Sequence, residues 1–376
     1  MAITILQEPT SYNVTGTPLV YTLSSSNQNE PQFRYITDIY EQGSSTMLTR
    51  LVSNKNLSGN TNINVSSILN DYLDYDYNFK TSLSGFTNNS KNFTIEFGEQ
   101  YGTSLDGPVT NYTASATDTL FYVSKGQLDY SQNYQKDGFN WDPSIGDPTG
   151  YIMSNSPATQ SFSPDEYLTL SFVDTTATVN YYETGSLAYT RTIGSPVYYT
   201  LGISPLNFNT EPIIQNADVI TVEVNSGSIS KRYELDTDCR DDSLRIAFIN
   251  KYATWDYYTI HNPVRRITQI DKQVYEIGST KLNEEQTTFN VSNRGITQYF
   301  TDYKDEFEIT TDSLTATESQ WLRELFTSTE VFIQSGTDMI PINILNTSET
   351  ISNNTARNKN YQYTIRYQYA NIREPR

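Results

Sequence analysis

The chain has 376 residues and a formal net charge of −18, with 43 Asp and Glu against 25 Lys and Arg. An electrostatic field of this sign repels phosphate backbones, so the charge excludes general nucleic-acid binding. The aromatic content of 13%, with 30 Tyr, excludes a disordered chain, because disordered segments contain few aromatic residues.

The N-terminal part of the chain contains short runs in which apolar and polar residues alternate. In one of them Leu19, Tyr21 and Leu23 occupy every second position. Further runs cover residues 31–43, 45–52, 92–102 and 119–130, and clusters of Gly, Asn and Ser separate them. This pattern is typical of antiparallel strands joined by polar turns.

A short amphipathic helix is predicted among these strands, within residues 62–76. Four apolar residues share one helical face: Ile68, Leu69, Tyr72 and Leu73. Asn64 or Ser66 is the expected N-terminal cap of this helix.

Residues 129–165 are rich in Gly and Pro and are predicted to form a long loop. Long loops in compact proteins are commonly functional or interfacial. We therefore take Trp141 and Tyr151 in this loop, together with Trp255 in the second half of the chain, as candidate interface or ligand residues.

A second series of strands begins after this loop, and the restart places a domain boundary near residue 178. The predicted domains are residues 1–178 and 179–376. In the second domain, residues 218–235 form a predicted hairpin around the sequence NSGS, and residues 243–261 form further strands.

The segment from residue 313 to 329 has the pattern of a well-capped helix. Thr315 and Glu318 match the capping box, in which each side chain caps the backbone amide of the other. The helix predicted over residues 315–327 carries an apolar stripe that we expect to anchor it on a sheet: Trp321, Leu322, Leu325 and Phe326.

A hairpin around Gly336 and a long terminal strand are predicted after this helix. In residues 361–372, Tyr and Ile alternate with polar residues in the clearest period-two run of the chain. We expect this strand to be exposed and to pair with a neighbouring subunit by strand addition. Together the elements predict a mainly β protein with two or more antiparallel β-sandwich-like domains, each with a short amphipathic helix.

The sequence predicts no catalytic residue, no cofactor and no metal site. His261 is the only histidine and Cys239 the only cysteine, which is too few for a typical tetrahedral zinc site. We expect His261 to be structural, at a strand end before a turn. Asp74 and Asp76 have the spacing of a calcium loop, but Phe79 stands where an EF-hand needs glycine, so a solvated turn is expected.

The N-terminus has no basic region and no long apolar core, so no signal peptide is expected. No run approaches the roughly 20 apolar residues of a membrane helix, so no membrane insertion is expected either. We expect the chain to be made in a cytoplasm and to become part of an assembly.

Four segments resemble structural virion proteins of tailed bacteriophages, in particular those that infect Bacteroidetes-like hosts: FRYITDIYEQG, INVSSILNDYLDYD, FTIEFGEQYG and SLRIAFINKYATWDYYTI. The C-terminal block, in which a short helix with Trp321 precedes a hairpin and a long strand, is similar to an arrangement in tail and neck components. The resemblance implies a non-enzymatic subunit of the tail, tail tip or neck. It also implies a homo-oligomer in the virion that contacts other virion proteins.

Two alternatives stay open. A receptor- or carbohydrate-binding fibre or spike module would contact a host surface glycan or receptor, with Trp141 and Trp255 as its expected contacts. A hydrolase of cell-surface glycan would need two carboxylates on opposite sides of a cleft.

Overall fold

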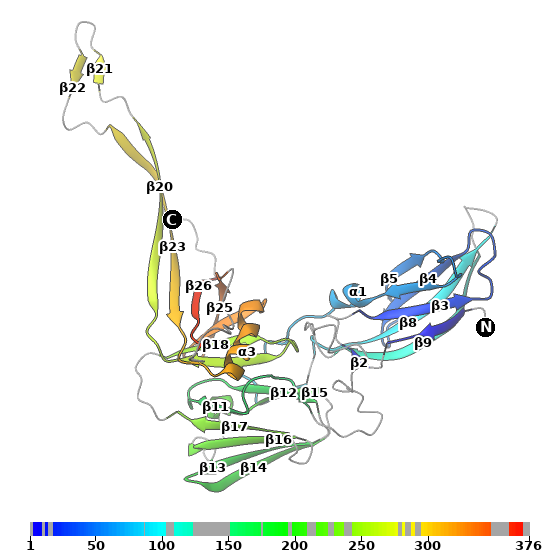
Figure 1. The fold of residues 1–376 in the computed structure, drawn as a ribbon, viewed down its shortest axis with the longest axis horizontal. Helices are drawn as coiled ribbons and strands as arrows, with labels where there is room; N and C mark the ends of the chain where they lie inside the picture. Colours follow the sequence, from blue (N-terminus) through cyan, green and yellow to red (C-terminus); the bar gives the residue numbers. More distant parts are fainter. Residues whose placement is uncertain are drawn as a thin grey trace.

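The computed structural model is built almost entirely of β-sheets, which confirms the predicted fold class (Figure 1). Its sheets form an N-terminal body, a central body and a C-terminal body. The structure describes residues 3–9, 12–13, 18–85, 87–102, 109–122, 151–173, 176–194, 198–208, 216–224, 229–236, 243–276, 280–282, 287–289, 295–346 and 361–370.

The N-terminal body is a β-sandwich whose two inner faces enclose one core. Alternation along one strand buries Tyr21 and Leu23, and the ring of Tyr21 lies 5.2 Å from that of Phe97 in the facing sheet. Helix α1 (Ser66–Asn70) adds Leu69 to this core. One sheet has the order β1 (Ile3–Gln7), β3 (Val20–Ser25), β6 (Thr61–Asn64), and the other β2 (Tyr12–Asn13), β9 (Val109–Tyr122), β8 (Asn92–Tyr101), β4 (Arg34–Glu41), β5 (Met47–Ser53).

The central body also pairs two sheets, and its core contains the buried rings of Phe172, Tyr181 and Tyr199. A 3-10 turn, η2 (Pro205–Asn207), lies beside it. One sheet has the order β10 (Tyr151–Ile152), β12 (Thr169–Val173), β15 (Tyr198–Gly202), β7 (Leu83–Gly85). The other has the order β11 (Thr159–Phe162), β17 (Ile229–Leu235), β16 (Val219–Val224), β13 (Thr176–Glu183), β14 (Ser186–Gly194), and in it β11 and β17 pair in parallel.

The domain boundary predicted near residue 178 is therefore wrong, because that residue lies inside β13 of the central body. Strands from both sides of it share the same sheets: β12 pairs with β15, and β7 comes from much earlier in the chain. Period-two patterns mark strands but carry no information about their partners, so the restart of the strand series did not mark a boundary.

The C-terminal body is a seven-stranded sheet with helix α3 (Ala316–Thr327) against one face. Its order is β19 (Trp255–Ile260), β18 (Leu244–Ile249), β24 (Val331–Ser335), β25 (Asp338–Ile344), β26 (Thr364–Tyr369), β23 (Ile296–Thr310), β20 (Arg265–Glu276). The predicted hairpin at Gly336 is confirmed as β24 and β25, and Gly336 has a φ of 59°, which favours glycine.

The terminal strand β26 does not offer a free edge. It lies between β25 and β23 and pairs with both of them, so the expectation of strand addition at this strand is wrong. The regular alternation of this segment instead reflects burial of one face, which packs into the core with α3. The buried side chains on that face are Tyr363, Ile365 and Tyr367.

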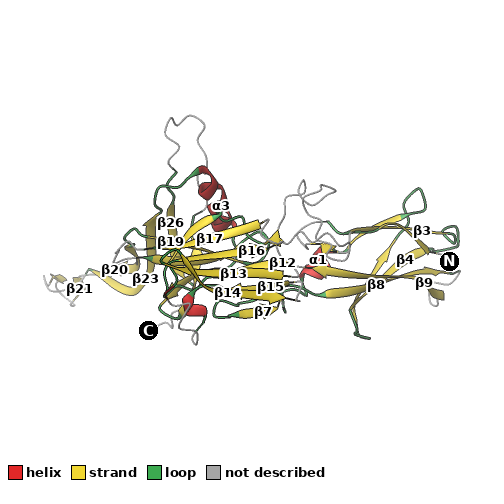
Figure 2. Ribbon diagram, turned by 90° about the horizontal axis from the view of Figure 1, so that it is seen from below, coloured by secondary structure: helices red, strands yellow, loops and turns green. Residues whose placement is uncertain are grey.

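The molecule is elongated, with the N-terminal body at one end of its long axis and the hairpin β20–β23 at the other (Figures 1 and 2). Beyond the hairpin lies a small pair of strands, β21 (Thr280–Leu282) and β22 (Thr287–Phe289). Among the described residues no helix has the length and apolar character needed to cross a membrane.

Candidate assembly interface

The hairpin β20–β23 extends beyond the C-terminal body as an arm, which we define as residues 265–276 and 296–306 (Figure 1). Its strands pair antiparallel, from Arg265 opposite Glu308 to Glu276 opposite Ile296. The neighbouring strand β26 reaches only residues 307–310 of β23. Most side chains of the arm are consequently exposed.

One face of the arm carries an apolar stripe, formed by Ile270, Val274, Ile296 and Tyr303. Ile270 lies directly opposite Tyr303, and the alternation along each strand puts all four side chains on the same face. They are 57%, 56%, 61% and 48% exposed in that order. Exposed apolar side chains gathered on one face of a hairpin are typical of an interaction surface.

The apolar stripe continues the face of the sheet that is buried nearer the base. Tyr303 shares its face of β23 with Phe307 and Ile309 because side chains alternate along a strand. Ile309 is 1% exposed and packs in the core with Trp321 and Leu322 of α3, and Phe307 packs against that core. The helix therefore covers this face at the base, whereas the same face is exposed along the arm.

The opposite face of the arm is polar near the base and aromatic near the tip. Tyr275 and Tyr299 lie 5.8 Å apart between ring centroids, and the hydroxyl of Tyr299 donates to Gln273 Oε1 at 2.6 Å. A bulge in the pairing, next to Gln273, places Tyr299 beside Phe300 on this face.

Two ion pairs lie near the base of the arm. Arg266 Nη2 lies 2.7 Å from Asp305 Oδ2 within the hairpin, and Arg366 Nε of β26 lies 3.0 Å from Glu308 Oε2. Further along the arm, the carboxylates of Asp271 and Asp302 lie directly opposite each other. Like charges in such positions weaken strand pairing.

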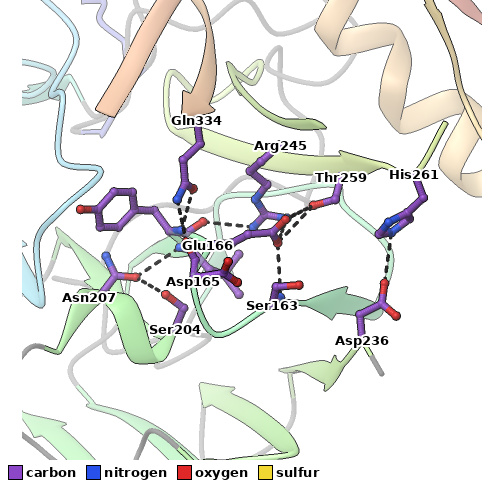
Figure 3. Close-up of polar contacts among 12 residues, drawn as sticks. Ser163, Asp165, Glu166, Ser204, Asn207, Asp236, Arg245, Thr259, His261 and Gln334 are labelled. Atoms are coloured by element: carbon purple, nitrogen blue, oxygen red, sulfur yellow. Dashed lines mark hydrogen bonds and ion pairs between the residues drawn. The ribbon is translucent and has the colours of Figure 1, made fainter. Parts of the chain in front are cut away.

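The base of the arm belongs to a sheet that is firmly joined to the central body. Arg245 of β18 is 4% exposed in its side chain, and its guanidinium lies 3.4 Å from Glu166 Oε2 (Figure 3). Arg245 also donates to Thr259 Oγ1 at 2.8 Å and to the carbonyl of Tyr167 at 3.1 Å. Gln334 of β24 accepts from the backbone amide of Tyr167 at 2.8 Å. Bonds of this kind hold the C-terminal sheet in one orientation.

Helix α3 is anchored on the sheet by its apolar stripe and by one buried hydrogen bond. Trp321, Leu322 and Leu325 are buried, and Phe326 packs at the edge of the same core. The indole of Trp321 donates to Asp256 Oδ2 at 2.7 Å. Burial raises the pKa of Asp256 to about 6, with a smaller contribution from repulsion by Glu324, although the bond from Trp321 opposes the shift.

A buried lysine lies next to a serine hydroxyl in the same region. Lys231 Nζ donates to Ser156 Oγ at 2.6 Å and also to the carbonyls of Ser156 and Pro157. Burial lowers the pKa of Lys231 to about 8, and the field of Asp256 opposes this shift. A serine–lysine pair can act as nucleophile and base. Here three acceptors surround the amine and both side chains are buried, so the lysine serves as an anchor for the loop after β10.

The candidate interface residues predicted from the sequence do not come together. Trp141 lies outside the described residues. Tyr151 begins β10 and pairs with Val173 rather than lying in a loop, and its side chain is not described. Trp255 is 4% exposed in β19 and donates its indole hydrogen to the carbonyl of Asp76 at 2.7 Å, so its assignment as an interface or ligand residue is wrong.

The residues weighed for metal or acid–base chemistry are used structurally. His261 Nε2 lies 3.1 Å from Asp236 Oδ2 at the junction with the central body (Figure 3). Asp76 is 6% exposed rather than solvated, and its carboxylate accepts from the backbone amides of Thr87 and Asn88, at 3.0 Å each. In the part of the chain that the structure describes, no group of three or more metal-ligating side chains is assembled.

The sequence analysis did not predict the arm, although the apolar pattern of its two strands is visible in the sequence. From Tyr299 to Ile309, apolar or aromatic residues recur at positions 299, 303, 307 and 309 of one strand. Ile270 and Val274 recur in the same way in the strand before it. Period two predicts such strands, but it does not reveal that their apolar face would be exposed.

A comparison of the chain with protein-family models gave no match. A comparison with curated proteins gave no match either.

Proposed function

We propose that this chain is a non-enzymatic structural subunit of a tailed-bacteriophage virion, in the tail, tail tip or neck, and that it works by assembling with copies of itself and with neighbouring virion proteins. The observation that carries the proposal is the arm, because exposed apolar side chains gathered on one face of a projecting hairpin are typical of a surface that binds a partner. The sequence resemblance to virion proteins supports the same setting.

The rest of the molecule suits a structural role. Two β-sandwich bodies and a seven-stranded sheet are held together by buried polar bonds such as that between Arg245 and Glu166. The buried carboxylate Asp256 and the buried amine Lys231 are engaged by Trp321 and Ser156 respectively. Rigid bodies of this kind keep the contacts on their surface at fixed distances and angles, which a subunit of a ring or spike requires.

The mass of the purified chain tests the proposal. We expect light scattering and negative-stain electron microscopy to show a discrete oligomer, with a mass that is a whole multiple of the chain mass. We also expect the chain to be found in purified particles. A chain that is monomeric at every concentration and absent from particles would contradict the proposal.

The receptor-binding alternative is favoured by one observation, the aromatic cluster of Tyr275, Tyr299 and Phe300 near the tip of the arm. Aromatic faces stack on sugar rings, and such a cluster on a projecting arm suits a fibre or spike module that contacts a host surface glycan. Binding to host polysaccharide that is lost in Tyr299→Ala, and retained in the nearby Gln298→Ala, would favour this alternative.

A further inference from the structure

The assignment of a partner to the apolar stripe of the arm rests on the proposed function of a self-assembling subunit. The stripe shares its face with Arg266 near the base, Lys272 in the middle and Glu276 near the tip. We propose that this face packs against the same face of a second copy, with the two arms antiparallel about a two-fold axis.

The size of the face fits a contact between two copies. A hairpin with about ten residues in each strand is ~33 Å long and ~10 Å wide. With its side chains, one such face offers on the order of 700 Å², close to the ~800 Å² that each partner contributes to a standard interface.

The order of charges along the face favours a second copy in the antiparallel orientation. Arg266 and Glu276 lie ten residues apart on the same face of β20. Antiparallel packing brings Glu276 of one copy to Arg266 of the other, at both ends of the contact. An isologous contact of this kind uses each patch twice, so one stripe with opposite charges at its ends is complementary to itself.

The low charge of the arm removes the main obstacle to such a contact. The whole chain carries a net charge of −18, and two copies therefore repel each other at most of their surface. On the stripe face, Arg266 and Asp305 neutralise each other at 2.7 Å, and Lys272 balances Glu276. The stripe face of one arm thus carries two cations, Arg266 and Lys272, and two carboxylates, Asp305 and Glu276, so it lacks the negative net charge of the chain as a whole.

The test compares two double variants of strand β20 in the full-length chain. Ile270→Lys with Val274→Lys places two charges on the stripe face, whereas Gln269→Lys with Gln273→Lys places the same charges on the opposite face of the same strand. We expect sedimentation to show a dissociation constant raised at least ~100-fold in the stripe variant and changed less than ~10-fold in the control. All four positions are exposed, and equal melting temperatures of both variants and the parent will show that the fold is retained.

Each outcome decides between the inference and the function on which it rests. If the parent assembles and the stripe variant assembles equally well, the inference is overturned while the proposed function stands. The inference is also overturned if both variants lose assembly equally, because the contact would then not be specific to one face. A parent that is monomeric at every concentration overturns the inference, and one that is also absent from purified particles overturns the proposed function itself.

A charge reversal tests the orientation of the two arms. Glu276→Arg should weaken assembly more than Glu276→Gln, because antiparallel arms then bring two cations together at both ends of the contact. Assembly of Glu276→Arg as strong as that of the parent would overturn the antiparallel arrangement.

Discussion

At the scale of single residues, Asp256 has the most unusual environment among the described carboxylates. It is 4% exposed, accepts the indole hydrogen of Trp321 and lies within the field of Glu324. A buried carboxylate is disfavoured in its charged form because it has lost its hydration. The bond from Trp321 compensates only in part, since burial still raises the pKa to about 6.

The raised pKa of Asp256 predicts a pH dependence of stability. In the unfolded chain the carboxyl returns to its ordinary pKa of 3.8, so between about pH 4 and pH 6 the folded state binds its proton more tightly. The free energy of unfolding should therefore fall as the pH rises through this window. The decrease should approach ~3 kcal/mol for this group, because each pKa unit corresponds to ~1.4 kcal/mol.

Urea unfolding of the parent and of Asp256→Asn, measured across this pH range, checks the prediction. The asparagine keeps an acceptor for Trp321 but does not titrate, so the difference between the two proteins should change with pH. Asp338→Asn, at an 81% exposed side chain, serves as the control and should follow the parent. Parallel curves for the parent and Asp256→Asn would contradict the assignment.

At the scale of elements, helix α3 combines strong local signals with a tertiary anchor. The capping box is present as predicted: Thr315 Oγ1 accepts from the amide of Glu318 at 3.2 Å, and Glu318 Oε2 accepts from the amide of Thr315 at 2.7 Å. Helix α1 is different, because its cap residue is Val65 and no side chain caps it. Asn64 instead accepts from the amides of Leu19 and Ser66.

Removing the capping box should destabilise α3 measurably. Thr315→Ala loses the side-chain acceptor at the helix N-terminus and should reduce the free energy of unfolding by ~1 kcal/mol. Thr327→Ala, in the last turn of the same helix, should cost much less, because Thr327 Oγ1 bonds only to carbonyls within the helix. Chemical denaturation of the two variants measures the difference, and equal losses would argue against the role of the cap.

Two carboxylates of β23 in the arm, Asp302 and Asp305, are expected to have opposite effects on the stability of strand pairing. Asp302→Asn should stabilise the pairing by a few tenths of a kcal/mol, because it removes the repulsion from Asp271. Asp305→Asn should destabilise it by ~1 kcal/mol, because Asp305 pairs with Arg266 at 2.7 Å and its side chain is 5% exposed. Hydrogen exchange at the arm amides should slow in the first variant and accelerate in the second. The same direction in both would contradict this account.

At the scale of the whole molecule, the C-terminal sheet and the central body share one core. Ala247, Ile249 and Tyr257 of the C-terminal sheet lie in the same cluster as Phe172 and Tyr199 of the central body. The N-terminal body reaches this core through Phe79, whose ring lies 4.4 Å from that of Trp255. The arm therefore projects from bodies that are packed against each other, rather than from a flexible linker.

The buried pair of Arg245 and Glu166 should be essential to this junction. Arg245→Met leaves Glu166 buried without its cation and should cost 3–5 kcal/mol, roughly the loss typical of a broken buried pair. Arg245→Met combined with Glu166→Gln should recover part of that loss, because no uncompensated charge remains. Urea denaturation measures both. A loss below about 1 kcal/mol for Arg245→Met would mean that the pair behaves like an exposed one.

The sequence by itself determined the local elements. Period two in residues such as Leu19, Tyr21 and Leu23 sufficed to locate strands, and Thr315 with Glu318 sufficed to start a helix, because these signals depend on neighbours within a few positions. The apolar stripe of α3 likewise predicted a buried face, because removing the apolar surface of Trp321 and Leu325 from water is favourable.

The tertiary structure alone decided which strands pair and which faces stay exposed. Trp255 and Ile270 both occupy apolar positions of strands, yet the first is 4% and the second 57% exposed. The difference arises because β19 is stacked against the central body, whereas the arm extends beyond the described elements that cover its base. Strand partners and coverage depend on contacts between distant segments, which local alternation does not encode.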